Sequence, residues 1–380
     1  MMLFEYEAKE IFRKHGINVP KSVIVQSPTE VGKALQSLSL PVAIKAQVLV
    51  GGRERAGGIK FANSLEEASE KIEELMRSKI EGKVVNKILV EEKVDAKHEY
   101  YLGITTDQLS GKPIVMVSLE GGVDIEDIAK EKPETIIYKK VSLSRGFFQF
   151  EARNMCQQLG LSRTLLQKVS DILYKLYRVF DYYDAVTSEI NPLTVTKEEE
   201  VYAVDAKLEI DDNSIFRHPD IDLRLDERFE DEIEKEAIKN RLSYVKLDGN
   251  IGVIGSGAGL TMATVDLIEA FGGKPANFLE TGGGITDELM EKAVEIVLKD
   301  RRLKALLINL YGGINPMVDA AKGIVKAYKK LKPNIPIRVK LIGNQQEEAW
   351  SILETAGILV VKEIQTEVAV KKLISLLGEQ

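Results

Sequence analysis

Two segments, TSEINPLTV (residues 187–195) and VYAVDAKL (residues 201–208), flank a short charged turn. Both alternate β-branched or apolar residues with polar ones, which predicts an antiparallel β-hairpin. A register that pairs the two valines beside the turn also places Asn191 opposite Asp205. Directly opposed side chains have Cβ atoms about 4.5–5.5 Å apart, close enough for an amide oxygen and a carboxylate to share Mg²⁺. Glu189 projects from the same face. An ordinary hairpin with a polar outer face shows the same pattern, so both interpretations stay open.

The bulk composition indicates a multidomain globular protein. Its 380 residues exceed what one hydrophobic core usually serves, so two or three domains are expected. The net charge of -7 argues against nucleic-acid binding, which requires a basic face. The N-terminal residues are acidic where a signal peptide is basic, and no apolar run is long enough to span a bilayer. We therefore expect a cytoplasmic protein with neither a nucleic-acid nor a membrane partner.

The first half of the chain mixes helices and strands without regular alternation, which predicts an α+β domain with a largely antiparallel sheet. The expected elements are helices at 5–14 and within 146–180, and strands at 42–45, 88–92, 100–104 and 113–119. The strands at 88–92 and 100–104 are close in sequence, so we expect them to pair with each other.

Strands and helices alternate strictly after an acidic, turn-poor segment at 211–246. Within that segment the run 226–232 suits a solvated helix between domains. The expected division is a first domain at 1–225, a helical connector at 226–246 and a second domain at 247–380. Strands are expected at 251–254, 276–279, 305–310, 337–342 and 359–361, with helices starting near Leu260, Thr286, Pro316, Gln345 and Thr366. This pattern predicts an open parallel sheet with helices on both faces, which binds ligands beyond the carboxyl ends of its strands.

Lys45 closes a short apolar strand and faces the glycine-rich stretch 51–58. A lysine there can reach nucleotide phosphates while backbone amides of the loop, helped by Arg53, cover them. A mobile loop beside a strand-end lysine would look the same. Glu91 and Glu99 stand at strand ends, where one can accept from an adenine amine and the other from ribose hydroxyls. Together with Lys45 and the predicted metal pair, these carboxylates supply the groups that phosphoryl transfer needs, namely a phosphate-binding site, metal ligands and contacts to the nucleotide.

Glycines are concentrated at the predicted strand ends of the second half, at 255–259, 282–284 and 312–313. The triple glycine precedes a helix N-terminus, where free amides favour an anion. The loop at 255–259 lacks the spacing of the dinucleotide fingerprint.

The sequence offers no nucleophile assembly. His15, His98, His218 and the single Cys156 each lack a neighbouring base or a plausible metal cluster. If the chemistry needs a covalent phosphoryl carrier, another chain must supply it.

Ordered motifs along nearly the whole chain resemble the β subunit of succinate–CoA ligase. They lie at 5–9, 51–53 with 56–58, 189–193, 247–252, 275–279 with 282–284, and 312–314. The resemblance implies an ATP-grasp domain of two subdomains, followed by a CoA-ligase domain with a flavodoxin-like doubly wound sheet. It implies reversible ligation of succinate to CoA with Mg²⁺ and ATP/ADP. Succinyl phosphate and a phosphohistidine on a partner α subunit are its intermediates, and that partner holds most of the CoA.

The same resemblance assigns site residues. Nucleotide-binding positions are Lys45, Gly52, Arg53, Glu54, Glu91, Val94 and Glu99, and the magnesium ligands are Asn191 and Asp205. Glu189 falls where the family contacts the phosphohistidine, and we assign it a catalytic role. Positions for the acid substrate are Ser256, Gly313, Ile314 and Asn315.

Three departures from the family pattern concern the ligands. Glu54-Arg55 replaces a Gly-Lys pair in the phosphate loop, Ser256 replaces an asparagine, and 314–317 replaces an Ile-Val-Arg segment. Malate–CoA or citrate–CoA ligation therefore remains open beside succinate, as does a non-catalytic nucleotide-binding scaffold. ATP is expected over GTP, and the assembly is αβ or α2β2.

Overall fold

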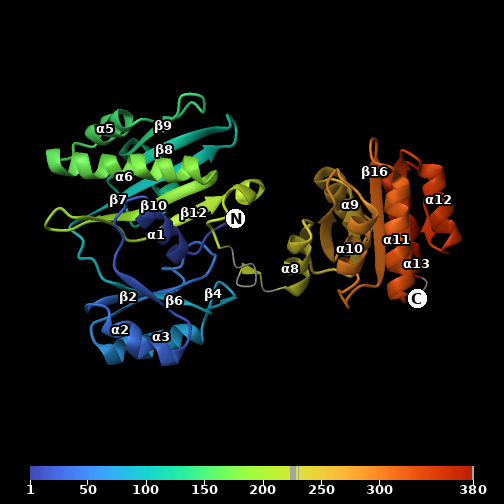
Figure 1. The fold of residues 1–380 in the computed structure, drawn as a ribbon, viewed down its shortest axis with the longest axis horizontal. Helices are drawn as coiled ribbons and strands as arrows, with labels where there is room; N and C mark the ends of the chain where they lie inside the picture. The colour runs from blue at the N-terminus through green and yellow to red at the C-terminus, as the bar shows by residue number, and fades with distance from the viewer. Residues whose placement is uncertain (223–227, 230, 379–380) are drawn as a thin grey trace. The chain divides into compact units, whose positions relative to one another are not determined.

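The computed structural model describes residues 1–222, 228–229 and 231–378 (Figure 1). The chain divides into two compact units, Met1–Asp222 and Leu223–Gln380, called here the N-terminal and the C-terminal unit. Part of the predicted connector, residues 226, 227 and 230, lies outside the described residues.

The N-terminal unit contains a small antiparallel sheet in the order β1-β6-β2-β3. Its strands are β1 (Ser22–Val25), β6 (Ile88–Glu92), β2 (Val42–Ala46) and β3 (Ile59–Ala62). Helices α2 (Val31–Gln36) and α3 (Leu65–Met76) cover one face of this sheet (Figure 1). The apolar side chains of Ile44, Ile72 and Val90 are fully buried between these layers. A short hairpin of β4 (Lys79–Ile80) and β5 (Lys83–Val84) and a 3-10 helix, η1 (Pro28–Glu30), complete this half.

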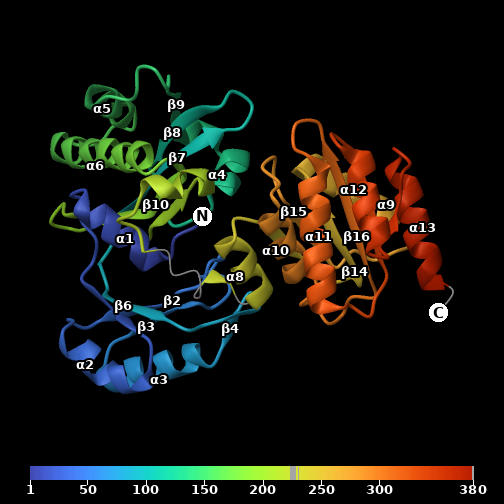
Figure 2. The ribbon, with the colours of Figure 1, turned by 45° about the vertical axis from the view of Figure 1, so that its right-hand side comes forward.

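A second, larger sheet of the same unit runs in the order β11-β10-β7-β8-β9, with β12 also paired to β10. The strands are β7 (His98–Asp107), β8 (Lys112–Ser118), β9 (Ile136–Lys140), β10 (Ala185–Val195), β11 (Val201–Ala203) and β12 (Lys207–Ile210). Helices α5 (Gln149–Gln158) and α6 (Arg163–Tyr182) lie over one face, and α1 (Glu5–Lys14) lies between the two sheets (Figures 1 and 2). The remaining elements are α4 (Ile125–Glu131), η2 (Pro133–Thr135) and η3 (Asp212–Arg217).

The predicted pairing of the strands at 88–92 and 100–104 is wrong. β6 lies between β1 and β2 in the small sheet, whereas β7 pairs with β8 and β10 in the large one. The intervening residues cross from one sheet to the other, since Lys93 N bonds Pro41 O and Lys97 N bonds Val195 O, both as donors. Sequence proximity favoured a hairpin, but each strand has better partners elsewhere.

The predicted hairpin is confirmed, together with its register. Val195 pairs with Val201 in β10 and β11, and Glu189 pairs with Lys207 in β10 and β12. The same register, continued between β11 and β12, places Asn191 opposite Asp205.

The C-terminal unit has one sheet in the order β13-β15-β14-β16-β17-β18. The strands are β13 (Ser243–Lys246), β14 (Ile251–Gly255), β15 (Asn277–Glu280), β16 (Ala305–Gly312), β17 (Ile337–Gly343) and β18 (Leu359–Val360). The helices are α8 (Glu232–Lys239), α9 (Ala258–Ala270), α10 (Asp287–Val297), α11 (Met317–Leu331), α12 (Gln346–Thr355) and α13 (Thr366–Gly378). Side chains of α10, α11 and α12 form the core on one face, and those of α9 and α13 form it on the other. The predicted alternation and doubly wound architecture are confirmed.

One edge of this sheet differs from the prediction. β13 runs antiparallel to β15 and lies inside the segment expected to be a helical connector, of which α8 is the described helical part. The alternating Ser243-Tyr244-Val245-Lys246 has only its tyrosine buried, as befits an edge strand. Within the described residues, no helix is long and apolar enough to cross a membrane.

Candidate active site

A cleft of about 880 Å³ opens in the N-terminal unit and is lined by both of its sheets. Contributions come from the ends of β2 and β6, the glycine-rich loop, the hairpin and the loop at 122–126. Every residue predicted for nucleotide, metal and catalysis lines it, namely Lys45, Gly52, Arg53, Glu54, Glu91, Val94, Glu99, Glu189, Asn191 and Asp205. The fold therefore brings together residues as distant in the sequence as Lys45 and Asp205.

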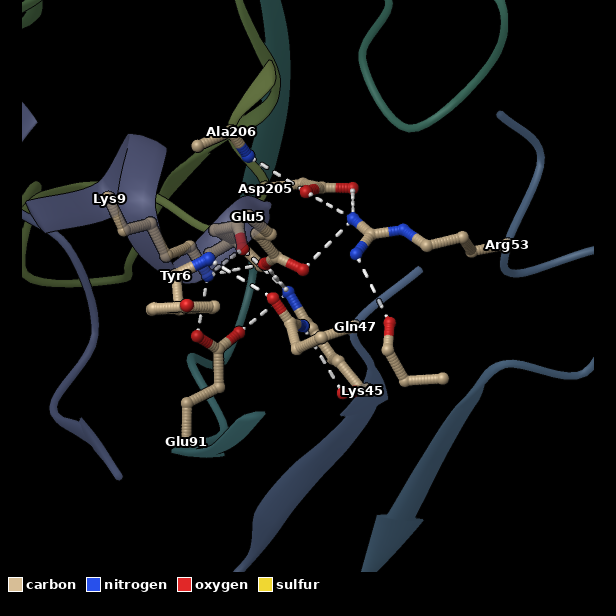
Figure 3. A network of polar contacts seen from close by, with 11 residues as sticks. Glu5, Tyr6, Lys9, Lys45, Gln47, Arg53, Glu91, Asp205 and Ala206 are labelled. Carbon is tan, nitrogen blue, oxygen red and sulfur yellow. Dashed lines mark hydrogen bonds and ion pairs between the residues drawn. The ribbon is translucent and has the colours of Figure 1, made fainter. Parts of the chain in front are cut away.

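The floor of the cleft is a buried network of charged side chains (Figure 3). The Lys45 ammonium lies 2.6 Å from Glu91 Oε1 and 3.0 Å from Glu5 Oε1. Lys9 of α1 lies 2.7 Å from Glu5 Oε1 and 2.5 Å from Glu91 Oε2. Both ammonium groups also donate to the Val204 carbonyl at 2.6 Å. Each lysine is thus held by two carboxylates and one backbone oxygen.

Glu5 and Lys9 are the residues that the sequence analysis missed as parts of this site. They occupy positions i and i+4 of α1, on the face that also buries Ala8 and Phe12. Charged residues at the buried positions of an amphipathic helix are unusual unless they are paired. That mismatch between charge and periodicity was the available signal.

Electrostatics favour the charged forms of Glu5 and Lys45. Burial opposes the charge on Glu5, but Lys45, Lys9 and Arg53 outweigh it and hold the pKa of Glu5 well below its usual value. Burial likewise opposes the charge on Lys45, yet Glu5 and Glu91 raise the pKa of that ammonium. A buried ion pair stays charged only when neighbours compensate the lost hydration, as they do here.

Arg53 extends from the glycine-rich loop into the same network. Its Nη2 donates to Asp205 Oδ1 at 2.9 Å and Oδ2 at 3.2 Å, and lies 2.9 Å from Glu5 Oε2. Its Nη1 donates to the Ala46 carbonyl at 3.3 Å. Burial lowers the pKa of Arg53, but Asp205 and Glu5 reverse this and raise it.

The loop carrying Arg53 accommodates Glu54 without backbone strain. Gly52 and Gly57 are its members with positive φ, at 66° and 74°, and Glu54 is not among the positive-φ residues. The turn is closed by Gly58 N, which donates to Arg53 O at 2.7 Å. A glutamate therefore fits the fold at this position, and its exposed side chain lies near Glu99, whose pKa is raised by burial and then by Glu54.

Asn191 and Asp205 present oxygen donors of the kind that Mg²⁺ prefers. Asn191 Oδ1 accepts from Gly122 N at 2.8 Å, and Asp205 Oδ1 accepts from Ala206 N at 2.8 Å besides its contacts with Arg53. Burial, followed by repulsion from Glu5, raises the pKa of Asp205 despite Arg53. A cation bound there would relieve that repulsion.

No cluster of three or more His, Cys, Asp or Glu suited to a metal occurs in the described part of the chain. An ion held by one carboxylate and one amide would complete its shell with water and substrate phosphates, which is the usual arrangement for Mg²⁺ beside nucleotides. The donor set thus fits Mg²⁺.

Glu189 and Glu91 both line the cleft, but their carboxylates have different partners. Glu91 is buried, and its two oxygens contact Lys9 and Lys45, so its carboxylate already serves the charged network. Glu189 accepts a long hydrogen bond, 3.4 Å, from the Tyr101 hydroxyl. Burial is the main cause that raises the pKa of Glu189, and Lys207 opposes the shift.

The predicted acid-site residues meet at the carboxyl edge of the C-terminal sheet. Ser256 follows β14, and its hydroxyl accepts from Tyr311 N at 2.9 Å, at the end of β16. Asn315 Nδ2 donates to the carbonyl of Gly283 in the triple-glycine loop. Gly313 and Ile314 are exposed in the same β16–α11 loop, Ile314 by 91%. The loops after β14, β15 and β16 therefore converge as predicted.

Two family models together match most of the chain. The ATP-grasp domain matches residues 2–195, and the CoA-ligase family matches residues 254–374. The protein is thus of the class of acid–CoA ligases that join an ATP-grasp domain to a CoA-ligase domain.

Individual relatives narrow the class. The chain is 43% identical over 354 residues to the GDP-forming succinate–CoA ligase subunit beta of Thermus thermophilus, with 93% of each chain covered. It is 42% identical over 358 residues to the ADP-forming subunit beta of Ignicoccus hospitalis, covering 94% of this chain and 95% of the relative. With that of Methanocaldococcus jannaschii the identity is 43% over 374 residues, covering 98% and 99%. The chain belongs to the family of succinate–CoA ligase β subunits.

A solved structure supports the fold. ATP citrate lyase from Methanothrix soehngenii, in complex with citrate and coenzyme A, superposes with a TM-score of 0.80 at 18% identity, covering 100% of this chain and 99% of that one. At this identity the likeness describes the architecture alone.

Proposed function

We propose that the chain is the nucleotide-binding β subunit of an ADP-forming succinate–CoA ligase that works only with an α subunit. The observation that carries the proposal is the cleft, where two phosphate-seeking cations, Lys45 and Arg53, lie beside the Asn191/Asp205 pair. Phosphoryl transfer rests on positioning and charge stabilisation, and these residue types supply both.

The residues have separate tasks in this proposal. Lys45 and Arg53 bind the triphosphate, amides of the loop at Gly52 and Glu54 cover it, and Val94 and Glu99 contact the base and the ribose. Glu91 keeps Lys45 ionised and in place. Asn191 and Asp205 hold Mg²⁺, which when bound neutralises charge on the transferring phosphoryl group.

The phosphoryl group leaves the cleft on a histidine of the partner. The described lining of the cleft contains neither histidine nor cysteine, which supports assigning the phosphorylated histidine to the partner. Glu189 lines the cleft, and in this proposal it contacts that histidine and accepts a hydrogen bond from its ring N–H. The phosphohistidine then phosphorylates succinate, and the CoA thiol displaces phosphate from succinyl phosphate.

The acid site is proposed at the carboxyl edge of the C-terminal sheet. Amides of Gly313 and Ile314 and the polar groups of Ser256 and Asn315 suit a carboxylate without adding charge. CoA is expected mainly on the α subunit.

Co-expression with an α subunit tests the proposal. CoA-dependent ADP formation is followed with succinate, malate and citrate in parallel, and with GTP in place of ATP. Succinate is expected to give the highest kcat/KM, and ATP to be preferred. Higher kcat/KM with malate or citrate would reassign the acid site, and Mg²⁺-dependent ATP binding without turnover of any acid would favour a nucleotide-binding scaffold.

A further inference from the structure

One guanidinium nitrogen serves two carboxylates in the cleft (Figure 3). Arg53 Nη2 lies 2.9 Å from Glu5 Oε2 and 2.9 Å from Asp205 Oδ1. Asp205 is also the proposed metal ligand, so the structure shows its carboxylate committed to an arginine. A divalent cation that takes this carboxylate must compete with Arg53, which contacts both oxygens.

The network is electrically balanced. Its six side chains carry three positive and three negative charges, namely Lys9, Lys45, Arg53 and Glu5, Glu91, Asp205. Within these six side chains an approaching cation meets no surplus negative charge, although the rest of the cleft lining adds carboxylates such as Glu99 and Glu189. When Asp205 turns to a metal ion, the other five groups carry one net positive charge beside the phosphate position. The same movement thus creates both a metal ligand and an anion-binding charge.

Arg53 is the member best placed to change partners. Lys9 and Lys45 are each fixed by Glu91 and the Val204 carbonyl, and each is almost completely buried. Arg53 instead comes from an exposed loop, and Glu5 already lies within contact of its Nη2. Glu5 can therefore retain the guanidinium when Asp205 leaves it.

We infer that Arg53 is a positioning residue whose guanidinium binds the Asp205 carboxylate while the cleft holds no nucleotide. When nucleotide and metal bind, Arg53 releases Asp205 and contacts Glu5 and the nucleotide phosphates instead. The inference rests on the proposed function, because it takes Asp205 as the metal ligand. It makes metal and nucleotide binding mutually reinforcing, since each releases what the other needs.

Metal binding without nucleotide tests the exchange. The full chain is titrated with Mn²⁺ alone, followed by electron paramagnetic resonance, and then with ADP at saturating Mn²⁺. Arg53→Gln should bind Mn²⁺ about tenfold more tightly than the wild type, because the competing charge-assisted bonds are gone, and should bind ADP more weakly. Arg53→Lys keeps the positive charge but loses the planar guanidinium that donates to two oxygens at once, so its Mn²⁺ affinity should rise by less than that of Arg53→Gln.

Two control variants distinguish the direct contact between Arg53 and Asp205 from the general effect of removing a charge from the cleft. Lys45→Gln removes a cation that does not touch Asp205, and its gain in Mn²⁺ affinity should be at most about threefold. Glu5→Gln should weaken nucleotide-free Mn²⁺ binding, since Arg53 then has Asp205 as its remaining carboxylate partner. Thermal unfolding checks that each variant is folded.

The outcomes decide between two failures. If Arg53→Gln gives no gain, or Lys45→Gln gives an equal one, the exchange is wrong. In that case a loss of Mn²⁺ binding in Asp205→Asn would still leave the proposed metal site standing. A gain that persists in the Arg53→Gln/Asp205→Asn double variant would place the metal elsewhere and overturn both the exchange and the metal assignment.

Discussion

The cleft of the N-terminal unit and the carboxyl edge of the C-terminal sheet differ in the charge and the solvent exposure of their residues. The cleft consists of charged side chains withdrawn from water, such as Lys45, which is 3% exposed. The edge consists of glycine-rich turns and the uncharged side chains of Ser256, Ile314 and Asn315, and Ile314 is 91% exposed. One region is assembled before any ligand arrives, and the other offers backbone that a ligand can approach.

This difference implies different couplings between function and stability. In the buried network of the cleft, each charge also neutralises a neighbour, so its removal should damage the fold as well as ligand binding. At the edge, an altered residue faces solvent and should affect the ligand alone. Four substitutions, ordered by expected effect, examine this contrast.

Lys45→Met should have the largest effect on stability. It leaves Glu5 and Glu91 with one buried cation fewer, and breaking a buried pair costs about 3–5 kcal/mol. Urea unfolding of the full chain measures the loss. The matched control is Lys14→Met, an exposed i,i+4 pair of α1 with Glu10, for which about 0.5 kcal/mol or less is expected. Equal losses in both variants would show that the network adds nothing to stability.

Asp205→Ala should abolish most phosphoryl transfer. Loss of the proposed metal carboxylate is expected to lower kcat by about 100-fold or more. CoA-dependent ADP formation with succinate and the α subunit measures it, and circular dichroism checks the fold. Asp171→Ala, at a half-buried ion pair of α6 with Lys175 that lies outside the cleft lining, serves as control. Turnover within a few-fold of the wild type would remove Asp205 from the metal site.

The sequence predicted which residues line the cleft better than it predicted the contacts between them. Alternation predicted the hairpin, and a period of two relates every opposed pair once one pair is known, so the observed pairing of Val195 with Val201 puts Asn191 opposite Asp205. The regular βα alternation likewise placed the loops that converge at the edge of the second sheet. Such local patterns carry their own geometry.

Long-range partners were not readable in the same way. The chain crosses between sheets after Glu92, and nothing in residues 93–97 distinguishes a crossing from a hairpin turn. The commitment of Glu91 to Lys9 and Lys45 depends on α1 lying between the two sheets, a tertiary fact. Edge strand β13 was missed because its four residues follow a charged helical pattern.

Gly313→Ala tests the carboxyl edge of the C-terminal sheet, where a substitution should affect ligand binding and leave stability unchanged. An added Cβ at Gly313 meets no atom within 4 Å and its φ is not positive, so the fold should tolerate it. A ligand approaching the backbone would meet the methyl group, and KM for succinate should rise about tenfold, or ~1.4 kcal/mol, with KM for ATP unchanged. Gly32→Ala in α2, also in open space, is the control. An unchanged KM for succinate would move the acid site away from this loop.

The smallest effect concerns a second buried lysine, which tests whether carboxylate partners are what keep Lys45 charged. Lys340 of β17 is 2% exposed and donates to Asn309 Oδ1 at 3.1 Å, and none of the ion pairs among the described residues includes it. Burial alone lowers the pKa of Lys340, whereas carboxylates raise that of Lys45. Between the lowered folded value and the unfolded value near about 10.4, the unfolded chain binds more protons, so stability should rise with pH.

Lys340→Met removes this slope. The difference in the free energy of unfolding between the wild type and Lys340→Met should therefore move in favour of the wild type as the pH is raised from about 9 to 10, by at most about 1.4 kcal/mol. The unpaired Asn309 oxygen lowers the variant's stability at every pH and does not alter the slope. Lys322→Met, on the exposed side of α11, should run parallel to the wild type. Parallel curves for Lys340→Met would mean that Lys340 keeps its proton without a carboxylate, and the contrast between the two buried lysines would then have to come from hydration rather than from ion pairing.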